Sequence, residues 1–509
     1  MAQSDRVRVT LVRVWGRIRQ TYRARVSVII GRPGDTIGSG RFLQRCERWG
    51  IDNHRGMIVT SCEPTKELSA FIARTGYSDL PVDVLARTKD CILDWIGCAY
   101  GGKGSPADVS MASLIREMEG RRTSTLVGAG CSASPMQAAL YNGMISAVME
   151  IDDVHEMVSL RPGIGVIPAA LAVAEHADAS GKDLLAAVAI GYDVAVRVAR
   201  AAGGSHYRFW HSTGTCNTFG AAAAAGKLLR LDAERMLMAL GLAGTQAAGL
   251  WESINASAVT AKHLHSGKAA FNGILSAFLA RNGLKGSDTI LEGQKGFLAS
   301  SSTATDQDVM ALTQDLGNPF LIMRNFFKKY ACCKACIEGI DGIRTLMAGH
   351  ALRDSDVENV VVILPPENAW LVGNPTPKDP YEAKFSMPFC IALAAVTGGA
   401  SVHHFTDRML QDPRVQEWMR KVEIRADPDL AVRARIEAQC PGRGTFSVEP
   451  SIRSLMSEEV REKFTDVVRP VLSARRVGQI TDRIDRLEEI GDIREVTRVL
   501  RRKIEWRKE

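Results

Sequence analysis

The segment from His211 to Ala225 reads His-Ser-Thr-Gly-Thr-Cys-Asn-Thr-Phe-Gly-Ala-Ala-Ala-Ala-Ala. It joins an imidazole and several hydroxyl groups to a run of small apolar side chains. The alanine run is followed by Lys227 and is far shorter than the roughly 18–20 apolar residues that a membrane span requires. Small side chains let helices approach closely, so this segment predicts a helical protein whose packed interior adjoins a polar cluster.

Two further polar clusters lie in similar apolar, alanine-rich surroundings. The first is Met149-Glu-Ile-Asp-Asp-Val-His155, followed by Arg161-Pro-Gly, and the second runs from residue 260 to residue 268. Carboxylates, imidazoles and ammonium groups are costly to bury without partners. We therefore expect the three clusters to share one cleft, an arrangement suited to proton transfer on an anionic substrate.

Composition indicates an ordinary globular protein. The chain has 509 residues, 46% of them hydrophobic and 24% charged, which is enough for two or three domains. Aromatic residues make up only 6%, and alanine and glycine are abundant, which favours helix packing over a β-sandwich. The eleven cysteines are scattered, so we expect reduced thiols and a cytoplasmic location.

The formal net charge of +7 comes from the N-terminal residues 1–56, which contain twelve arginines and four acidic residues. The rest of the chain is close to neutral, so we expect no nucleic-acid partner. No apolar run is long enough for a membrane span, so we expect no membrane partner either. Three interpretations of this basic extension stay open. It is a non-native stretch of an over-long reading frame whose true start is Met57, an arginine-rich transit peptide, or an appended arm.

Helical patterning begins at Glu67 and continues to about Phe297. The sequence Asp79-Leu-Pro81 predicts a helix start, and five mostly apolar residues then recur at helical spacing. These residues are Leu85, Thr88, Ile92, Trp95 and Ile96.

The pattern changes near Phe320. Residues 357–364 and 422–426 are rich in β-branched side chains and predict strands, and residues 386–397 predict an apolar helix between them. Helix returns at Ser457-Glu-Glu459, a start that resembles a capping box. We expect one last helix over residues 477–502, with an apolar stripe that includes Ile480 and Leu500.

An ordered series of motifs resembles the MmgE/PrpD family. It comprises Leu126-Val-Gly-Ala-Gly-Cys-Ser-Ala-Ser-Pro135, Ala139-Leu-Tyr-Asn-Gly143, Ile151-Asp-Asp153, the segment quoted first with Lys227-Leu-Leu229, Glu382-Ala-Lys-Phe-Ser386 and Glu462-Lys-Phe464. The resemblance extends from Glu67 to the C-terminus. It implies an activity such as 2-methylcitrate dehydratase, cis-aconitate decarboxylase or iminodisuccinate epimerase, without an iron–sulfur cluster.

The resemblance also implies a mainly α fold, with a large all-helical domain, a smaller α+β lid domain, a homodimer and an active site between the domains. Together with the patterning, it predicts a helical domain over residues 57–322 and an α+β lid over residues 323–450. Residues 451–509 are then C-terminal helices that return to the helical domain.

The first cluster supplies candidate carboxylates and a cation. Glu150 and Asp153 share one face of a helix, and either is a candidate general base, with Asp152 beside them as a substrate-binding group. The alternative is a structural charge cluster at a helix end. Val154 replaces the family's usual threonine, and Arg161 replaces a histidine thought to transfer protons. Arginine is a poor base but grips carboxylates with two hydrogen bonds, so Arg161 is a candidate substrate-binding residue.

The other two clusters supply imidazoles and an ammonium group. His211 aligns with a family active-site histidine, and imidazole passes protons near neutral pH. Lys262 aligns with a family lysine and is a candidate catalytic cation, with His265 as a candidate substrate-binding residue. No third ligand follows His263 and His265 at a metal-binding spacing, so we expect no metal and no other cofactor.

The segment that opens the predicted lid contains Lys328 and Tyr330, which match the family's Lys-Pro-Tyr motif in part. Lys328 is a candidate substrate-binding residue and Tyr330 a candidate catalytic one. Ile337 replaces a family histidine and Phe389 replaces a tyrosine found in some members. The thiols of this segment lack a fourth ligand, so a structural role is favoured over a metal site.

These features predict a cofactor-independent lyase or isomerase of a small di- or tricarboxylic acid. A base removes a proton next to a carboxylate, and Lys262, Lys328 and Arg161 stabilise the resulting charge. The activity that the resemblance brings nearest is 2-methylcitrate dehydratase, with epimerisation or decarboxylation of a related acid as alternatives. A further alternative is a catalytically silent member that binds a metabolite or a partner.

Overall fold

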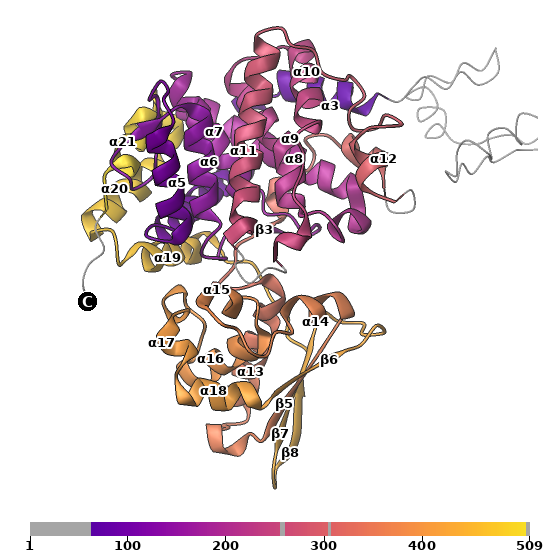
Figure 1. Ribbon diagram of the computed structural model, residues 1–509, viewed down its shortest axis with the longest axis vertical. Coiled ribbons are helices and arrows are strands. Elements are labelled where there is room, and N and C mark those ends of the chain that lie inside the picture. The colour runs from indigo at the N-terminus through magenta and orange to yellow at the C-terminus, as the bar shows by residue number, and fades with distance from the viewer. Residues whose placement is uncertain (1–62, 255–259, 304–306, 505–509) are drawn as a thin grey trace, which may run out of the picture.

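The computed structural model describes residues 63–254, 260–303 and 307–504. The predicted basic extension, residues 1–56, therefore lies outside the described residues. A helical part and a smaller α+β part stand one above the other in Figure 1. The predicted mainly α fold with a smaller α+β domain is confirmed.

The helical part is a bundle of antiparallel and crossing helices. Its members in chain order are α3 (Pro64–Arg74), α4 (Val82–Gly101), α5 (Pro106–Glu117), α6 (Pro135–Ser146), α7 (Gly163–His176), α8 (Gly181–Tyr207), α9 (Ser212–Leu228), α10 (Ala233–Gly244), α11 (Thr260–Arg281) and α12 (Phe297–Ser301).

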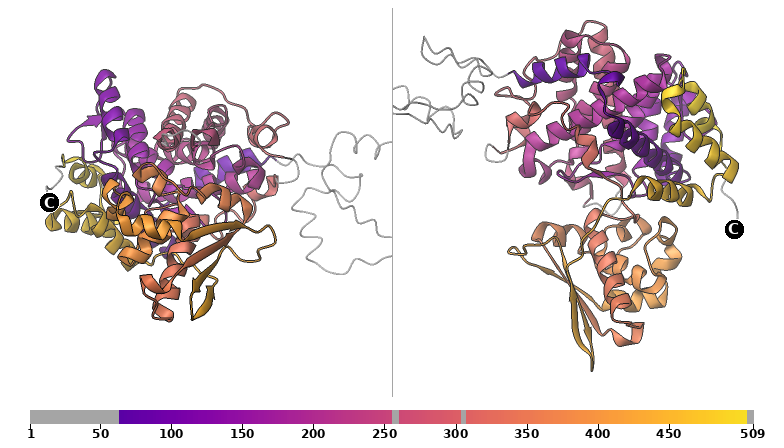
Figure 2. Two further views of the ribbon diagram at one scale, coloured as in Figure 1. Left: turned by 60° about the horizontal axis from the view of Figure 1, so that its bottom comes forward. Right: turned by 180° about the vertical axis from the view of Figure 1, so that it is seen from behind.

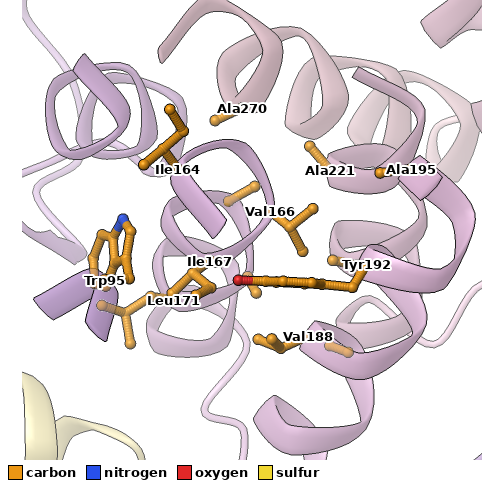
Figure 3. Packing of buried hydrophobic residues seen from close by; sticks show 14 of the residues in the cluster. Trp95, Ile164, Val166, Ile167, Leu171, Val188, Tyr192, Ala195, Ala221 and Ala270 are labelled. Carbon is orange, nitrogen blue, oxygen red and sulfur yellow. The ribbon is translucent and has the colours of Figure 1, made fainter. Parts of the chain in front are cut away.

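Helix α9 carries the alanine run and lies at the centre of this bundle, against α7, α8, α10 and α11. Its five alanines, Ala221 to Ala225, are fully buried. At Gly220 an added Cβ would lie 2.6 Å from the carbonyl oxygen of Gly191 on α8, so only glycine permits this approach. Figure 3 shows side chains of α7, α8 and α9 meeting there. Small residues thus explain the packing that the sequence predicts.

Helix α4 begins at Val82, one residue after Pro81, which occupies the N-cap position. Four of the five residues expected on its apolar face are buried, and Leu85 is half-buried. The predicted helix is therefore confirmed.

The α+β part contains a four-stranded sheet and six helices. The strands are β5 (Asn359–Leu364), β6 (Val422–Ala426), β7 (Arg435–Cys440) and β8 (Gly444–Val448), and the helices are α13 (Lys334–Gly349), α14 (Pro366–Val372), α15 (Pro380–Ala383), α16 (Met387–Thr397), α17 (Asp407–Leu410) and α18 (Pro413–Arg420).

The sheet has the strand order β6-β5-β7-β8. Strand β5 pairs in parallel with β6 and antiparallel with β7, which pairs antiparallel with β8. Helices α13 and α16 pack on each other and against the strands (Figure 1). Both predicted strands and the predicted helix over residues 386–397 are confirmed, with β5 starting at Asn359 and α16 at Met387.

The chain then returns to the helical part through α19 (Ser457–Val468), α20 (Ala474–Asp485) and α21 (Arg494–Arg501). Helix α19 packs along α4, and Figure 2 shows the three helices beside the N-terminal ones. The expected capping box is only half formed. Glu459 accepts a hydrogen bond from the Met456 amide, but the Ser457 hydroxyl donates to Asp90.

The single last helix predicted over residues 477–502 is wrong. The chain leaves the helix after Asp485, forms a short turn at η7 (Leu487–Glu489) and starts α21 after Gly491. The break lets the Ile490 carbonyl accept a hydrogen bond from the Gly181 amide at the start of α8.

The glycine-rich motif after α5 also helps to hold the C-terminal helices against the helical part. Its two short strands, β1 (Ser124–Thr125) and β2 (Ser132–Ala133), flank a loop in which Gly128 and Gly130 have φ of 68° and 77°. The amides of these glycines donate to the carbonyls of Leu500 and Arg501. The motif thus binds the last carbonyls of α21.

Buried apolar side chains form two clusters, one in the helical and C-terminal segments and one in the α+β part. The domain boundaries expected from the sequence, at residues 322 and 450, stay a prediction. A two-stranded ladder joins the parts, because β3 (Val154–His155) pairs antiparallel with β4 (Asn325–Phe326). Across the described ranges, no helix is long and apolar enough to cross a membrane.

Candidate active site

The loop between α6 and α7 carries the first polar cluster and holds it under backbone strain. Glu150 has a φ of 54°, a left-handed conformation that favours glycine. The ladder between β3 and β4 follows directly and brings the residues after β4 against this loop. Lys328 is thereby placed beside Glu150, and its ammonium group donates to the Glu150 carbonyl oxygen.

Three cations from separate segments meet at the Glu150 carboxylate. Arg161 Nη2 lies 2.7 Å from Oε1, Lys262 Nζ lies 2.5 Å from Oε2, and Lys328 Nζ lies 3.7 Å from Oε1. All four side chains are buried. The structure therefore brings together four of the candidate residues.

This arrangement sets the protonation states of the cluster. Burial raises the pKa of the Glu150 carboxyl, but Arg161, Lys262 and Lys328 outweigh burial and hold that pKa well below its usual range. Burial lowers the pKa of Lys262, against the pull of Glu150. Glu150 is therefore an ionised partner of the cations and a poor general base, contrary to one expected role.

Asp152 faces the same cations. Its carboxylate lies 3.5 Å from Arg161 Nε and 3.6 Å from Lys328 Nζ. Neither of its oxygens has a hydrogen-bond partner among the described residues. Lys384 is buried nearby and donates to the carbonyls of Met149 and Ala331. Four cations thus stand against two carboxylates, which leaves a buried site that attracts anions.

His211 occupies the N-cap position of α9 and is almost fully buried. Its Nδ1 lies 3.0 Å from Nδ1 of His265, and its Nε2 has no hydrogen-bond partner among the described residues. Burial, with Lys262 and His265 nearby, lowers the pKa of His211 well below its usual range. The imidazole is therefore neutral in this state, with one nitrogen free to exchange a proton.

Asp153 points away from the cations, and its expected role as a base stays a prediction. Its carboxylate accepts hydrogen bonds from the Gly163 amide, the Tyr192 hydroxyl and the Asn325 side-chain amide. Burial and the nearby Asp94 raise its pKa to about 6. Asp153 holds the loop to α7, α8 and β4.

Tyr330 also lies outside the cluster, and its expected catalytic role stays a prediction. Its hydroxyl is hydrogen-bonded to Asp341 and Arg344 on α13, both at 2.7 Å. Two of the altered family positions, Ile337 and Phe389, are buried in the apolar core of the α+β part. That core accommodates these two apolar residues in place of the family's histidine and tyrosine.

Three residues of the site escaped the sequence prediction. Lys384 lies in the Glu382–Ser386 motif, so the signal for it was present. Tyr207 and Trp251 carry no motif, and only the fold brings them to the site. The Trp251 ring lies tilted against His211 at a centroid distance of 4.5 Å and contacts Tyr207 edge-on at 5.0 Å.

A cavity of about 170 Å³ opens between the two parts of the molecule beside Arg161, the member of the cluster that lines it. The helical part contributes Arg161, Tyr207 and Trp251 to its lining, and the α+β part contributes Cys333 and Phe385. Phe385 also lies against the Lys262 ammonium group, 4.7 Å from ring centroid to Nζ. In the described residues no group of three His, Cys, Asp or Glu side chains is arranged to hold a metal ion.

Comparison with known protein families gives matches to both parts of the chain. Residues 66–310 match the MmgE/PrpD N-terminal domain, and residues 330–488 match the MmgE/PrpD C-terminal domain.

Named relatives cover most of the chain. It is 27% identical to cis-aconitate decarboxylase of Aspergillus terreus over 466 residues, or 84% of this chain and 94% of the relative. It is 27% identical to human cis-aconitate decarboxylase over 441 residues, or 82% and 90%. It is 30% identical to the cis-aconitate decarboxylase-like protein oryM of Aspergillus oryzae over 312 residues, or 58% and 64%. These relatives do not support 2-methylcitrate dehydratase specifically.

Proposed function

This chain belongs to the MmgE/PrpD family, and on that premise we propose that it is a carboxy-lyase of a tricarboxylic acid similar to cis-aconitate. One observation carries the proposal: Arg161, Lys262 and Lys328 converge on a single carboxylate in a buried site with excess positive charge. A homodimer and a cytoplasmic location stay predictions.

The cations are suited to the substrate's carboxylates. Arg161 presents a planar guanidinium that binds a carboxylate through two hydrogen bonds, whereas Lys262 and Lys328 supply compact charges. In the structure these groups are bound to Glu150 and Asp152. A tricarboxylate entering the cavity competes with these two side chains for the same cations.

Decarboxylation of such an acid needs a proton donor. When the CH₂–COO⁻ arm loses CO₂, the electron pair of the broken C–C bond forms a new double bond to the central carbon. The π electron pair of the original double bond then binds a proton at the carbon of that bond that is not the central carbon. The cations hold the two carboxylates that remain and stabilise the allylic charge that develops. No base has to remove a proton first.

We assign proton delivery to His211. Lys262 is the cation beside it. Burial, together with the positive charge nearby, lowers the pKa of His211. A bound tricarboxylate adds negative charge, which raises that pKa and favours the imidazolium ion. Substrate binding therefore favours protonation of His211, the proton donor.

Dehydration of an acid such as 2-methylcitrate is the second candidate, and Asp152 favours it. That reaction starts with the removal of a proton next to a carboxylate. The two oxygens of Asp152 have no hydrogen-bond partner among the described residues, so they are the available base. An epimerase would use the same group.

The test is to incubate the full chain in D₂O with cis-aconitate, 2-methylcitrate and amino-dicarboxylic acids, followed by proton NMR. Decarboxylation of cis-aconitate is expected, with one deuterium from solvent in the product and release of CO₂. We expect His211→Ala to abolish it. His350→Ala is the matched control, because His350 is exposed and lies on the α+β part.

Water loss from 2-methylcitrate without CO₂ release would replace the first candidate by the second. If no acid reacts but cis-aconitate raises the unfolding temperature, the chain is a silent family member that binds the acid. Equal activity of His211→Ala and the control would remove His211 from the mechanism.

A further inference from the structure

The cavity at Arg161 does not end at the cation cluster. It continues into a second cavity of about 910 Å³, and the two share Met157, Val158, Tyr207, Trp251 and Leu371 among their lining residues. A volume of this size lies in the range of pockets that bury drug-sized ligands. The space beyond the cluster thus far exceeds what a small tricarboxylic acid occupies.

The second cavity lies between α8, η2 (Trp251–Ile254) and α14. More of its surface is apolar than polar, and the charged side chains of Arg200, Arg208, Asp308 and Glu367 also line it. At its rim Trp370 is 67% exposed and Met157 is 44% exposed, an unusual cost for large apolar side chains. The α8 backbone kinks at Gly203, which has a φ of 72°, and neither Gly203 nor Gly204 fills the space with a side chain.

Aromatic rings connect this cavity to the candidate proton donor. Trp251 lies between His211 and Tyr207, at centroid distances of 4.5 Å and 5.0 Å. Tyr207 lines both cavities and shares the smaller one with Arg161. A carboxylate bound at Arg161 therefore leaves the rest of its molecule facing the rings of Tyr207 and Trp251.

From this continuity we propose that the substrate is a polycarboxylic acid with a large apolar substituent, an alkyl or phenylalkyl chain, which occupies the cavity between α8, η2 and α14. The inference rests on the proposed function, because it places the carboxylates at the cluster. The chain length that fills the cavity is then the main determinant of specificity.

The experiment compares acids that share three carboxylates and a double bond and differ only in an n-alkyl or phenylalkyl substituent on the methylene carbon. With the full chain, kcat/KM should rise about fourfold per buried methylene and then level off when the cavity is full. A rise in kcat/KM over several methylenes supports the inference. Equal or lower values for the substituted acids, with good turnover of the unsubstituted one, overturn it and leave the proposed function intact.

Gly204→Phe tests the location of the substituent. Gly204 lines the cavity, and an added Cβ there meets nothing within 4 Å, so a larger side chain has room at this position. We expect kcat/KM to fall at least tenfold for the longest substituents and to stay unchanged for the unsubstituted acid. Gly478→Phe is the matched control, because Gly478 lies on α20 and has equally open surroundings. An equal effect of both variants on all acids overturns the location.

Trp370→Ala is a second variant that does not depend on filling the cavity, and its exposed side chain contributes little to folding. It should raise KM for substituted acids and leave the unsubstituted acid unaffected. If no acid is turned over, calorimetric titration separates the two ideas. If substituted acids bind more tightly and Gly204→Phe removes this gain, the cavity assignment is supported although the carboxy-lyase proposal fails. Equal binding of all acids overturns the cavity assignment.

Discussion

Nδ1 of His211 and Nδ1 of His265 lie 3.0 Å apart, so the two imidazoles share one hydrogen. If His265 donates it, His211 carries its own hydrogen on Nε2, the nitrogen without a partner among the described residues. If His211 donates, its Nε2 is a free acceptor. The protonation of His265 therefore selects whether His211 is poised as an acid or as a base.

We expect His265→Leu to reduce kcat by roughly tenfold to a hundredfold with little change in KM, as for partners that orient a functional histidine. His265→Gln should retain more activity, because an amide both donates and accepts. The pH dependence of kcat should shift in His265→Leu. Identical kcat and pH profiles for the two variants would mean that His265 only fills space.

Glu150 is expected to stabilise the fold by neutralising buried cations. In Glu150→Gln the backbone shape is retained, but Arg161 and Lys262 lose their main partner, and we expect a loss of roughly 3–5 kcal/mol in the free energy of unfolding. Urea denaturation measures it. Glu156→Gln is the control: its partner Arg324 is 55% exposed, so the change should stay below about 1 kcal/mol.

The same variant tests whether Glu150 competes with the substrate. Added tricarboxylate should raise the unfolding temperature of Glu150→Gln more than that of the wild type, because the cations are then free. A smaller rise in the variant would show that Glu150 supports acid binding instead of opposing it.

Two buried histidines should make the fold sensitive to acid. Burial lowers the pKa of His155 and of His206 to about 4, from an ordinary value of 6.5. Between these pH values the unfolded chain binds protons that the native chain excludes, so stability is present above pH 6.5 and is lost as the pH falls. The raised pKa of Asp153 works in the opposite direction between about pH 6 and its unfolded value.

Below pH 6.5 the free energy of unfolding of the wild type should fall as the pH falls. In His206→Gln this fall should be less steep, by up to about 1.4 kcal/mol per pH unit. Urea denaturation at pH 5, 6, 7 and 8 measures the slope. An unchanged slope in the variant would mean that His206 titrates normally in the native state.

Much of the site could be predicted because burying charge is costly. Glu150, Arg161, Lys262 and His211 stand out as polar groups in apolar helical sequence, and the structure brings them together. The direction of each side chain could not be predicted in the same way. Asp152 faces the cations and Asp153 faces away because of the local backbone and the pairing of β3 with β4, which joins residues far apart in the chain.

In the fold, too, local features could be predicted from the sequence and long-range contacts could not. The strand β6 and the start of α19 follow from local pattern, since β-branched alternation and a helix start are signals within a few residues. The break in the last helix was signalled by Gly491, yet its reason is the long-range bond between Ile490 and Gly181. Tyr207 and Trp251 enter the site through tertiary packing alone.

The C-terminal helices hold the active-site loop through one buried ion pair. Lys463 on α19 lies 2.5 Å from Asp94 on α4 and donates a 2.6 Å hydrogen bond to the Ile151 carbonyl, between Glu150 and Asp152. We expect Lys463→Met to lower the free energy of unfolding by roughly 3–5 kcal/mol, because Asp94 is left buried and unpaired.

A double variant separates the two functions of this lysine. Lys463→Met with Asp94→Leu removes both charges, so most of the unfolding free energy should return. Activity should stay low, because the Ile151 carbonyl has still lost its donor and Asp152 its support. Recovery of both stability and kcat in the double variant would instead show that Lys463 serves only to pair Asp94, and that the loop keeps its shape without α19.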